Sequence, residues 1–209
     1  MSKPTIILIG AGGHAHSCID VIEQQNKYQI AGLVGMPLEI NDNHLGYQVI
    51  ATDDDLPQLV KEYDYALVSL GQILSPDSRI RLYQQAIKLG FQLPVIIAPT
   101  AYVSRHATLG SGTIVMHGSI VNAGVSVGDN CIINNRSLIE HDSTVEDHCH
   151  ISTGAILNGG VTIGAGSFIG SGTVIKEGIN IGQACVIGMG LSVRYNQLDL
   201  ARYTGKSTS

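Results

Sequence analysis

The residue best placed for chemistry is a histidine between two acids. His141 lies between Glu140 and Asp142. A neutral imidazole can take a proton from an attacking amine or hydroxyl, and a neighbouring carboxylate can fix its tautomer. These residues make His141 a candidate general base. The three residues alone favour the alternative, namely a solvent-facing histidine without a catalytic role.

A second candidate site is a glycine-rich segment near the start of the chain. Gly10-Ala11-Gly12-Gly13-His14 follows the apolar run Thr5–Ile9 and opens a predicted helix. Backbone N–H groups at such a position can bind a phosphate. An NAD site usually also has an acid at the end of the second strand. That strand ends here in Gly35-Met36, so nicotinamide chemistry is not expected.

The first half of the chain must position this loop. Short apolar runs alternate with helical segments, which predicts a Rossmann-like α/β domain with a small parallel sheet. We expect strands at 5–9, 30–34, 65–70 and 95–97, and helices at about 13–25, 53–62 and 76–89. Gly71 follows the third strand and is a further candidate for close approach to a ligand.

The second half of the chain has a different period, because an aliphatic residue recurs at every sixth position from Val103 to Val193. This period fits a parallel β-helix of hexapeptide repeats, in which three repeats make one triangular coil. Each coil then buries its aliphatic residues only against its neighbours. The residues in this phase are Val103, Leu109, Val115, Val121, Val127, Ile133, Ile139, Val145, Ile151, Leu157, Ile163, Ile169, Ile175, Ile181, Ile187 and Val193.

The position four residues after each aliphatic is mostly small, which predicts a second, narrower inward position. Cys131, Cys149 and Cys185 fall in this phase. A free cysteine behaves as a small hydrophobe. We therefore expect these cysteines to fill the core rather than to act as nucleophiles. The same register turns His141 outward.

Composition limits the classes of function. The chain has 44% hydrophobic and 14% charged residues and a net charge of −5, which argues against a disordered tail and against nucleic-acid binding. Its apolar runs are too short for a signal peptide or a membrane span. Four cysteines without a CxxC pair fit a reduced, cytoplasmic protein.

The two halves together resemble the NeuD/PglD family of sugar acetyltransferases. The resemblance covers nearly the whole chain, and its strongest part is residues 134–160, with Asn-Arg-Ser-Leu-Ile-Glu-His and Ile-Ser-Thr-Gly-Ala-Ile-Leu-Asn-Gly-Gly. It implies a left-handed β-helix and a C3 homotrimer. It also implies acetylation of a sugar precursor of bacterial surface glycans, with acetyl-CoA as co-substrate. The reaction that it implies first is N-acetylation of a nucleotide-linked amino sugar, and the alternative is O-acetylation of sialic acid or a related nonulosonic acid.

The resemblance also assigns roles to residues. It implies that His141 is the general base and that Asp142 raises its basicity. It implies acetyl-CoA contacts at His150, Gly159, Ser171 and Met189, with the backbone N–H groups around Gly159 and the His150 side chain as donors to the oxyanion. It implies sugar-substrate contacts at Gly12, Gly13, His14, Gly71 and Asn134.

Three other functions stay open. A γ-type zinc carbonic anhydrase shares the β-helix and would use histidines such as His117, His141, His148 and His150 as ligands. An acyl-carrier-protein-dependent acyltransferase and a non-catalytic sugar-binding trimer are the others. The context of His141 favours the acetyltransferase without a metal site.

Two segments of the chain depart from the family pattern. Relatives commonly carry Asp-Asp where this chain has Gly35-Met36, and Asp42 in the following loop is a candidate substitute for that nucleotide contact. Many relatives also close the last coil with Gly-x-Pro-Ala, which is missing here. These differences leave open which nucleotide or sugar is bound.

The change of period also sets the expected domain limits. We expect a Rossmann-like domain at 1–98, a β-helix at 99–193 and a tail at 194–209.

Overall fold

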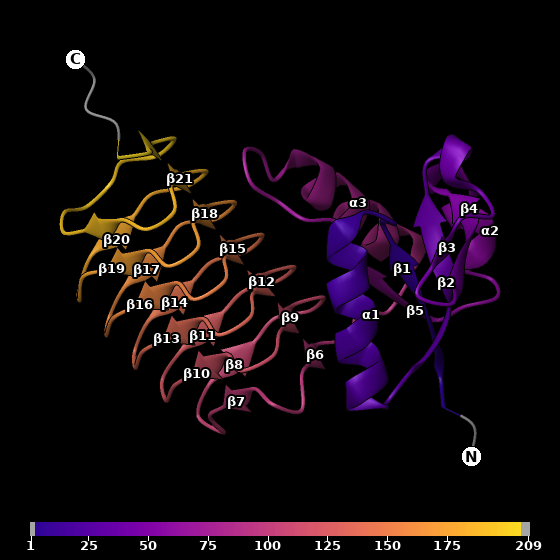
Figure 1. Cartoon of the computed structure of the whole chain (residues 1–209), viewed down its shortest axis with the longest axis horizontal. Helices are drawn as coiled ribbons and strands as arrows, with labels where there is room; N and C mark the ends of the chain where they lie inside the picture. The colour runs from indigo at the N-terminus through magenta and orange to yellow at the C-terminus, as the bar shows by residue number, and fades with distance from the viewer. Residues whose placement is uncertain (1–2, 206–209) are drawn as a thin grey trace. The chain divides into compact units, whose positions relative to one another are not determined.

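The computed structural model describes residues 3–205, which form two compact units (Figure 1). The first unit contains the chain up to Gly71 and the segment Asp77–Pro99. The second contains Gln72–Pro76 and the chain from Thr100 onward. The predicted limit at 98 and 99 lies beside this junction. No sequence feature had marked Gln72–Pro76 as separate from its neighbours.

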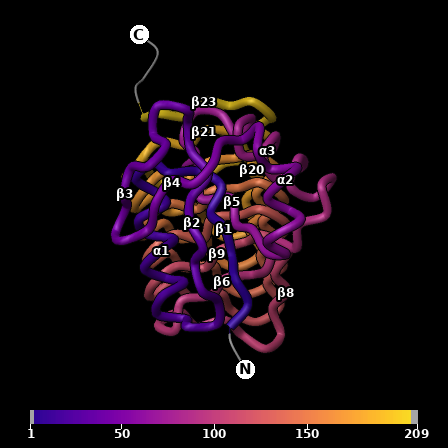
Figure 2. The backbone as a smooth tube through the Cα atoms, turned by 90° about the vertical axis from the view of Figure 1, so that its right-hand side faces the viewer, coloured from indigo at the N-terminus to yellow at the C-terminus, as the bar shows by residue number. Residues whose placement is uncertain are grey.

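The first unit is built on a five-stranded sheet with the order β3-β4-β2-β1-β5 (Figure 2). Its parallel strands are β1 (Thr5–Ile9), β2 (Gln29–Gly35), β4 (Tyr47–Thr52) and β5 (Tyr65–Val68), and β3 (Asn43–His44) pairs antiparallel with β4. Apolar side chains from these strands, including Ile7, Ile9 and Val34, are fully buried. The predicted Rossmann-like sheet is therefore confirmed.

Helices connect these strands. They are α1 (Gly13–Gln25), the 3-10 turns η1 (Pro37–Glu39) and η2 (Asp53–Asp55), α2 (Leu56–Leu59) and α3 (Asp77–Leu89). The helix α1 ends at Asn26, whose left-handed backbone closes the last turn. The helix expected at 53–62 is shorter than predicted, because Asp53–Asp55 forms a 3-10 turn and α2 ends at Leu59.

The sequence prediction missed two strands, β3 and β4. Val49 and Ala51 of β4 are buried between more exposed neighbours, which is the alternation of a half-buried strand. Two inward residues are too few for periodicity to identify. The strand predicted at 95–97 is present as β6 (Ile96–Ile97), but it is not part of this five-stranded sheet, so its predicted place in the Rossmann-like sheet is wrong.

The second unit is a left-handed parallel β-helix of two-residue strands, and those from β7 to β22 each end in the predicted aliphatic residue (Figure 1). One sheet stacks β7 (Tyr102–Val103), β10 (Ile120–Val121), β13 (Leu138–Ile139), β16 (Ile156–Leu157), β19 (Val174–Ile175) and β22 (Ser192–Val193). The next contains β8 (Thr108–Leu109), β11 (Ser126–Val127), β14 (Thr144–Val145), β17 (Thr162–Ile163) and β20 (Asn180–Ile181). The third includes β9 (Ile114–Val115), β12 (Ile132–Ile133), β15 (His150–Ile151), β18 (Phe168–Ile169), β21 (Val186–Ile187) and β23 (Arg202–Tyr203).

Strand pairing sets a coil of 18 residues. Val121, for example, pairs with Val103 on one side and with Ile139 on the other. The aliphatic residues of the inner coils are buried, and so are Cys131, Cys149 and Cys185 in the narrow phase. The predicted repeat and the core role of these cysteines are confirmed.

A left-handed backbone conformation recurs at every sixth residue of the turns. Glycine supplies most of these positions, since it has no Cβ to clash. The exceptions between 112 and 190 are Asn130, Arg136, Asp142, His148 and Ala184. Asp142 thus takes a conformation that side-chain-bearing residues seldom adopt.

The β-helix continues past Val193, where the tail was predicted to begin. Gln197 bridges to Ile181, and β23 pairs in parallel with β21. Residues 206–209 of that predicted tail lie outside the described residues. Between residues 3 and 205, no helix is long and apolar enough to cross a membrane.

The stacked core predicts that substitutions at inward positions lower the free energy of unfolding much more than substitutions at outward positions. Ile151 is fully buried in β15, and Ile151→Ala should lower the free energy of unfolding by about 2–5 kcal/mol. Ser126 points outward from β11 and is exposed, so Ser126→Ala should change it by no more than about 0.5 kcal/mol. Urea denaturation followed by circular dichroism measures both. Equal effects would contradict the stacked-core account.

Candidate functional site

The predicted site residues of the β-helix fall on two of the edges where the coil turns. We call the turns after β7, β10, β13, β16, β19 and β22 the histidine edge. We call the turns after β9, β12, β15, β18 and β21 the asparagine edge. The sheet that contains β13 lies between the two edges.

His141 and Asp142 form a pair on the histidine edge. The Nδ1 atom of His141 lies 2.9 Å from Oδ2 of Asp142, and both side chains are largely exposed. Since an ionised carboxylate only accepts, the imidazole carries its proton on Nδ1 and leaves Nε2 free as a base. The hydrogen bond to Asp142 is the main cause that raises the pKa of His141, and the charges of Asp142 and Glu140 add to it.

Gly159 makes room for the imidazole. It follows His141 by one coil, and a Cβ at Gly159 would lie 2.8 Å from both Cε1 and Nε2 of His141. The His141 carbonyl accepts a hydrogen bond of 2.9 Å from Gly160 N–H. Among the hydrogen bonds of residues 3–205, none uses the Gly159 N–H. A free donor therefore lies beside the candidate base.

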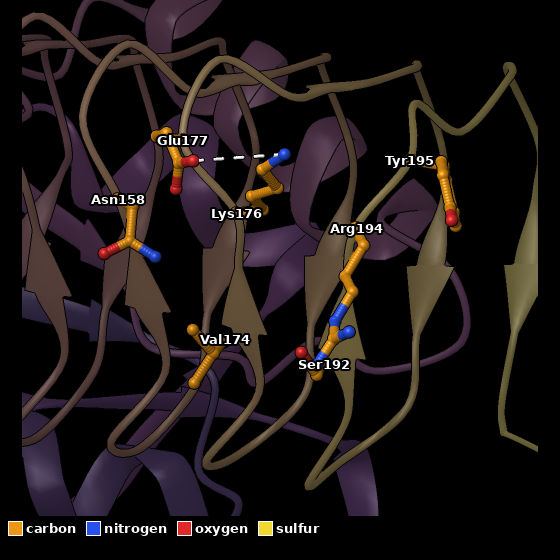
Figure 3. A pocket seen from close by; sticks show the side chains of 7 residues that line it. All are labelled: Asn158, Val174, Lys176, Glu177, Ser192, Arg194 and Tyr195. Atoms are coloured by element: carbon orange, nitrogen blue, oxygen red, sulfur yellow. Dashed lines mark ion pairs between the residues drawn. The ribbon is translucent and has the colours of Figure 1, made fainter.

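A pocket begins next to Gly159 and runs along the following coils (Figure 3). It has a volume of about 420 Å³, and its lining includes Asn158, Val174, Lys176, Ser192 and Arg194. These side chains stack because Asn158, Lys176 and Arg194 occupy the same position in three successive coils. The sequence-based prediction missed both cations, although their 18-residue spacing was a signal for them.

Asn134 and His150 come together away from His141. Asn134 Nδ2 donates to His150 Nε2 over 3.0 Å, and His150 Nδ1 donates to the Gln72 carbonyl over 2.6 Å. His150 is only 6% exposed and its ring packs edge-on against Phe168. Both ring nitrogens of His150 thus have partners, because the Gln72–Pro76 segment covers this side chain.

Ser171 and Met189 lie one coil apart on the asparagine edge. The Gly190 N–H donates to the Ser171 carbonyl, and the Ser171 hydroxyl lies 2.9 Å from that of Ser152. Met189 is 78% exposed. A small polar group and a flexible apolar group are thus available together on this edge.

The other histidines are dispersed within the chain. His117 is on the asparagine edge and His148 is in a turn after β14, so neither lies on the edge of His141. In the described part of the chain, no three or more His, Cys, Asp or Glu side chains are grouped to hold a metal ion. Burial raises the pKa of the Cys149 thiol well above its ordinary value, which suppresses the thiolate.

The glycine-rich loop lines a crevice in the first unit. Gly12 caps α1 without a side-chain hydrogen bond, and a Cβ at Gly12 or Gly13 would project into open space. Gly71 lies beside His14, with 3.5 Å between the Cβ of His14 and the Cβ that Gly71 lacks. The four residues predicted for substrate contact here are thus brought to one end of α1.

Comparison with protein-family models matches both halves of the chain. Residues 5–86 match the PglD N-terminal domain. Residues 142–177 match the bacterial transferase hexapeptide (six repeats), and residues 105–135 match the hexapeptide repeat of succinyl-transferase. Comparison with curated proteins finds no match.

Several solved structures are similar over nearly the full length. PerB from Caulobacter crescentus, in complex with CoA and GDP-perosamine, is 31% identical with a TM-score of 0.87, covering 95% of this chain and 92% of that one. The acetyltransferase domain of PglB from Neisseria gonorrhoeae, in complex with acetyl coenzyme A, is 30% identical with a TM-score of 0.87 and coverage of 95% and 94%. WeeI from Acinetobacter baumannii shares the fold at 20% identity. The perosamine enzyme also matches as variants in which one histidine is replaced.

The pairing of His141 with Asp142 predicts that a substitution at Asp142 changes the pKa of His141. Replacing Asp142 with Asn removes the hydrogen-bonded charge, so the pKa of His141 should fall. Glu140→Gln is the matched control and should lower it less, because Glu140 acts on His141 only by its charge and bonds to Asn122. NMR titration of the His141 ring measures both. An unchanged pKa in Asp142→Asn would refute the pairing.

Proposed function

Because the chain belongs to the NeuD/PglD-type family of sugar acetyltransferases, we propose that it N-acetylates a nucleotide-linked amino sugar. It is an acetyltransferase, and acetyl-CoA is its acetyl donor. The observation that carries the proposal is the free Nε2 of a carboxylate-paired His141 beside the free N–H of Gly159. The similar PerB structure holds GDP-perosamine and CoA. We place the reaction in the cytoplasm, since the four buried, free cysteines of the chain fit a reducing compartment.

The pocket of Figure 3 suits the donor. Lys176 and Arg194 supply positive charge for the phosphates of CoA, and Val174 supplies an apolar wall. Glu177 also lines the pocket and lies 4.0 Å from Lys176 Nζ, so Arg194 is the cation without an acidic neighbour in this lining. The pocket starts at Asn158, one residue before Gly159, so a thioester at that end would reach His141. Ser171 and Met189 lie on the opposite edge of the same sheet, where an adjacent copy of the β-helix would meet the donor.

His141 acts as the general base in direct transfer. Its Nε2 takes a proton from the sugar amine while the nitrogen attacks the thioester carbonyl carbon. The C–S bond then breaks, the acetyl group stays on nitrogen, and the CoA thiolate leaves and takes up a proton. Asp142 holds the ring and stabilises the imidazolium that forms. No cysteine is assigned a covalent step, because Cys131, Cys149 and Cys185 are buried in the core.

The Gly159 N–H is the proposed donor to the oxyanion of the tetrahedral intermediate. A backbone N–H without a partner costs nothing to redirect toward a developing charge. We assign this role to Gly159 rather than to His150, because both ring nitrogens of His150 already have partners. We infer that His150 holds Asn134, which then faces the sugar.

The acceptor's nucleotide occupies the crevice at Gly12, Gly13, His14 and Gly71. The first-turn N–H groups of α1 have no side-chain cap, and the open space over Gly12 and Gly13 suits a diphosphate. No acidic residue lies in the first turn of this helix to repel it.

An apolar outer face supports the proposed homotrimer. The outward residues of the sheet between the two edges are Tyr102, Ile120, Leu138, Ile156 and Val174. Those of the next sheet are Thr108, Ser126, Thr144, Thr162 and Asn180. Tyr102 is 57% and Ile120 is 39% exposed, which is unusual for a continuous apolar stripe with no partner. Packing through this face around a C3 axis would bring the histidine edge of one protomer to the asparagine edge of the next.

The proposed function is tested by thiol release from acetyl-CoA. UDP-, GDP- and dTDP-linked amino sugars are compared with the same sugars carrying a hydroxyl in place of the amine, and with free and CMP-linked sialic acid. We expect CoA release only with a nucleotide-linked amine. Release only with hydroxyl acceptors would replace N-acetylation with O-acetylation.

His141→Ala should lower kcat by about 10²–10⁴-fold, the usual contribution of a general base. Binding of acetyl-CoA, measured by calorimetry, should be unchanged. His106→Ala is the matched control. His106 is an exposed histidine on the same edge as His141, and its ring accepts a hydrogen bond from Arg105. Full activity in His141→Ala would exclude the mechanism.

The trimer is tested at two neighbouring strands. Ile120→Arg places a charge in the apolar face and should give a monomer without activity, whereas Ser126→Arg on the polar face should leave a trimer. Light scattering after size-exclusion chromatography measures the mass of each. A monomeric wild type, or a trimeric and active Ile120→Arg, would contradict the assembly.

A further inference from the structure

The crevice of the first unit lies where an α/β sheet ordinarily binds its ligand. Its volume is about 600 Å³, and it is lined by residues that follow β1, β2, β4 and β5, among them Gly10, Gly12, Met36, Thr52 and Leu70. The carboxyl ends of parallel strands are the general ligand site of such sheets. On the proposed function, this crevice holds the nucleotide of the acceptor.

The strand β2 ends without an acid, but a carboxylate reaches that place from elsewhere. The turn η1 folds Glu39 back over the end of β2, and its Oε2 accepts a hydrogen bond of 2.7 Å from Met36 N–H. A Cβ at Gly35 would lie 2.8 Å from the same oxygen. Val49 Cγ1 and Ala11 Cβ would lie 2.9 and 3.2 Å from the same Cβ, so a side chain at Gly35 would meet the Glu39 carboxylate and these two neighbours together.

Glu39 has an oxygen available for a ligand. It lines the crevice and is only partly exposed. Within residues 3–205, no hydrogen bond uses its Oε1 atom. A fixed carboxylate can only accept hydrogen bonds, so the ligand group in front of it must be a donor.

The other acids near the crevice fit this position less well. Asp53 is engaged at 3.0 Å by Arg81. Asp54 also lines the crevice, but it is exposed and follows β4 rather than β2. Asp42, the substitute suggested by the sequence, is exposed and is not part of the crevice lining. Glu39 is thus the carboxylate at the end of β2, where α/β nucleotide sites hold a ribose hydroxyl.

We propose that Glu39 accepts a hydrogen bond from the ribose 2′-hydroxyl of the acceptor's nucleotide, with the diphosphate at Gly12 and Gly13. This assignment rests on the proposed function and makes it narrower. The acceptor is a ribonucleoside diphosphate sugar, because a 2′-deoxyribonucleotide such as dTDP lacks the donor that Glu39 needs.

The test compares nucleotide binding by calorimetry with GDP, UDP, dGDP and dUDP as probes. Wild type should bind the better of GDP and UDP about 10-fold more tightly than its 2′-deoxy form, as a charge-assisted hydrogen bond requires. Glu39→Gln keeps the length of the side chain and an oxygen for Met36 N–H. This variant should lose most of that discrimination, with thermal stability unchanged.

Asp42→Asn is the matched control, since it removes one charge from the same loop, and it should behave as wild type. Equal discrimination in Glu39→Gln and wild type would overturn the assignment while leaving acetyl transfer intact. If Glu39→Gln weakened the binding of ribo- and deoxyribonucleotides equally, the assignment would be overturned too. A wild type that binds none of the four probes would overturn both this assignment and the nucleotide-linked acceptor, whereas CoA release from other acceptors would still report acetyl transfer.

Discussion

Each coil of the β-helix can bury its aliphatic side chains only against the coils before and after it. This single requirement sets the 18-residue repeat, because each inward side chain must lie directly over its equivalent, as Val121 lies between Val103 and Ile139. A slip by one residue would turn the whole inward set outward. The turns inherit the same register, and with it the left-handed backbone at every sixth residue.

The candidate site uses that register directly. Stacking places Gly159 over His141, and the absence of a side chain at Gly159 leaves room for the imidazole. The left-handed conformation at Asp142 is a structural demand of the turn, and it presents the carboxylate to Nδ1 of the preceding histidine. The position of Asn158 recurs as Lys176 one coil further on and as Arg194 two coils further on. One edge of a rigid scaffold thereby combines a base, a hydrogen-bond donor and a cationic pocket.

Sequence patterns predicted the parts of this arrangement that repeat. The β-helix, the inward cysteines and the outward His141 all follow from a period that continues over many residues. The strand β4 was missed because only Val49 and Ala51 point inward. The burial of His150 could not be predicted, since Gln72 is far from it in sequence. The position of Glu39 depends on a single 3-10 turn after β2, which has no periodic signal.

The central claim is that the imidazole of His141, tuned by Asp142, takes the proton from the acceptor. The pH dependence of kcat/KM for wild type and Asp142→Asn tests it most directly. Asp142 raises the pKa of His141, so its removal keeps the ring neutral to lower pH and makes it a weaker base. The account predicts that the acidic limb of the profile shifts to lower pH in the variant while the plateau falls. An acidic limb that stays in place while the ring itself titrates at lower pH would contradict it.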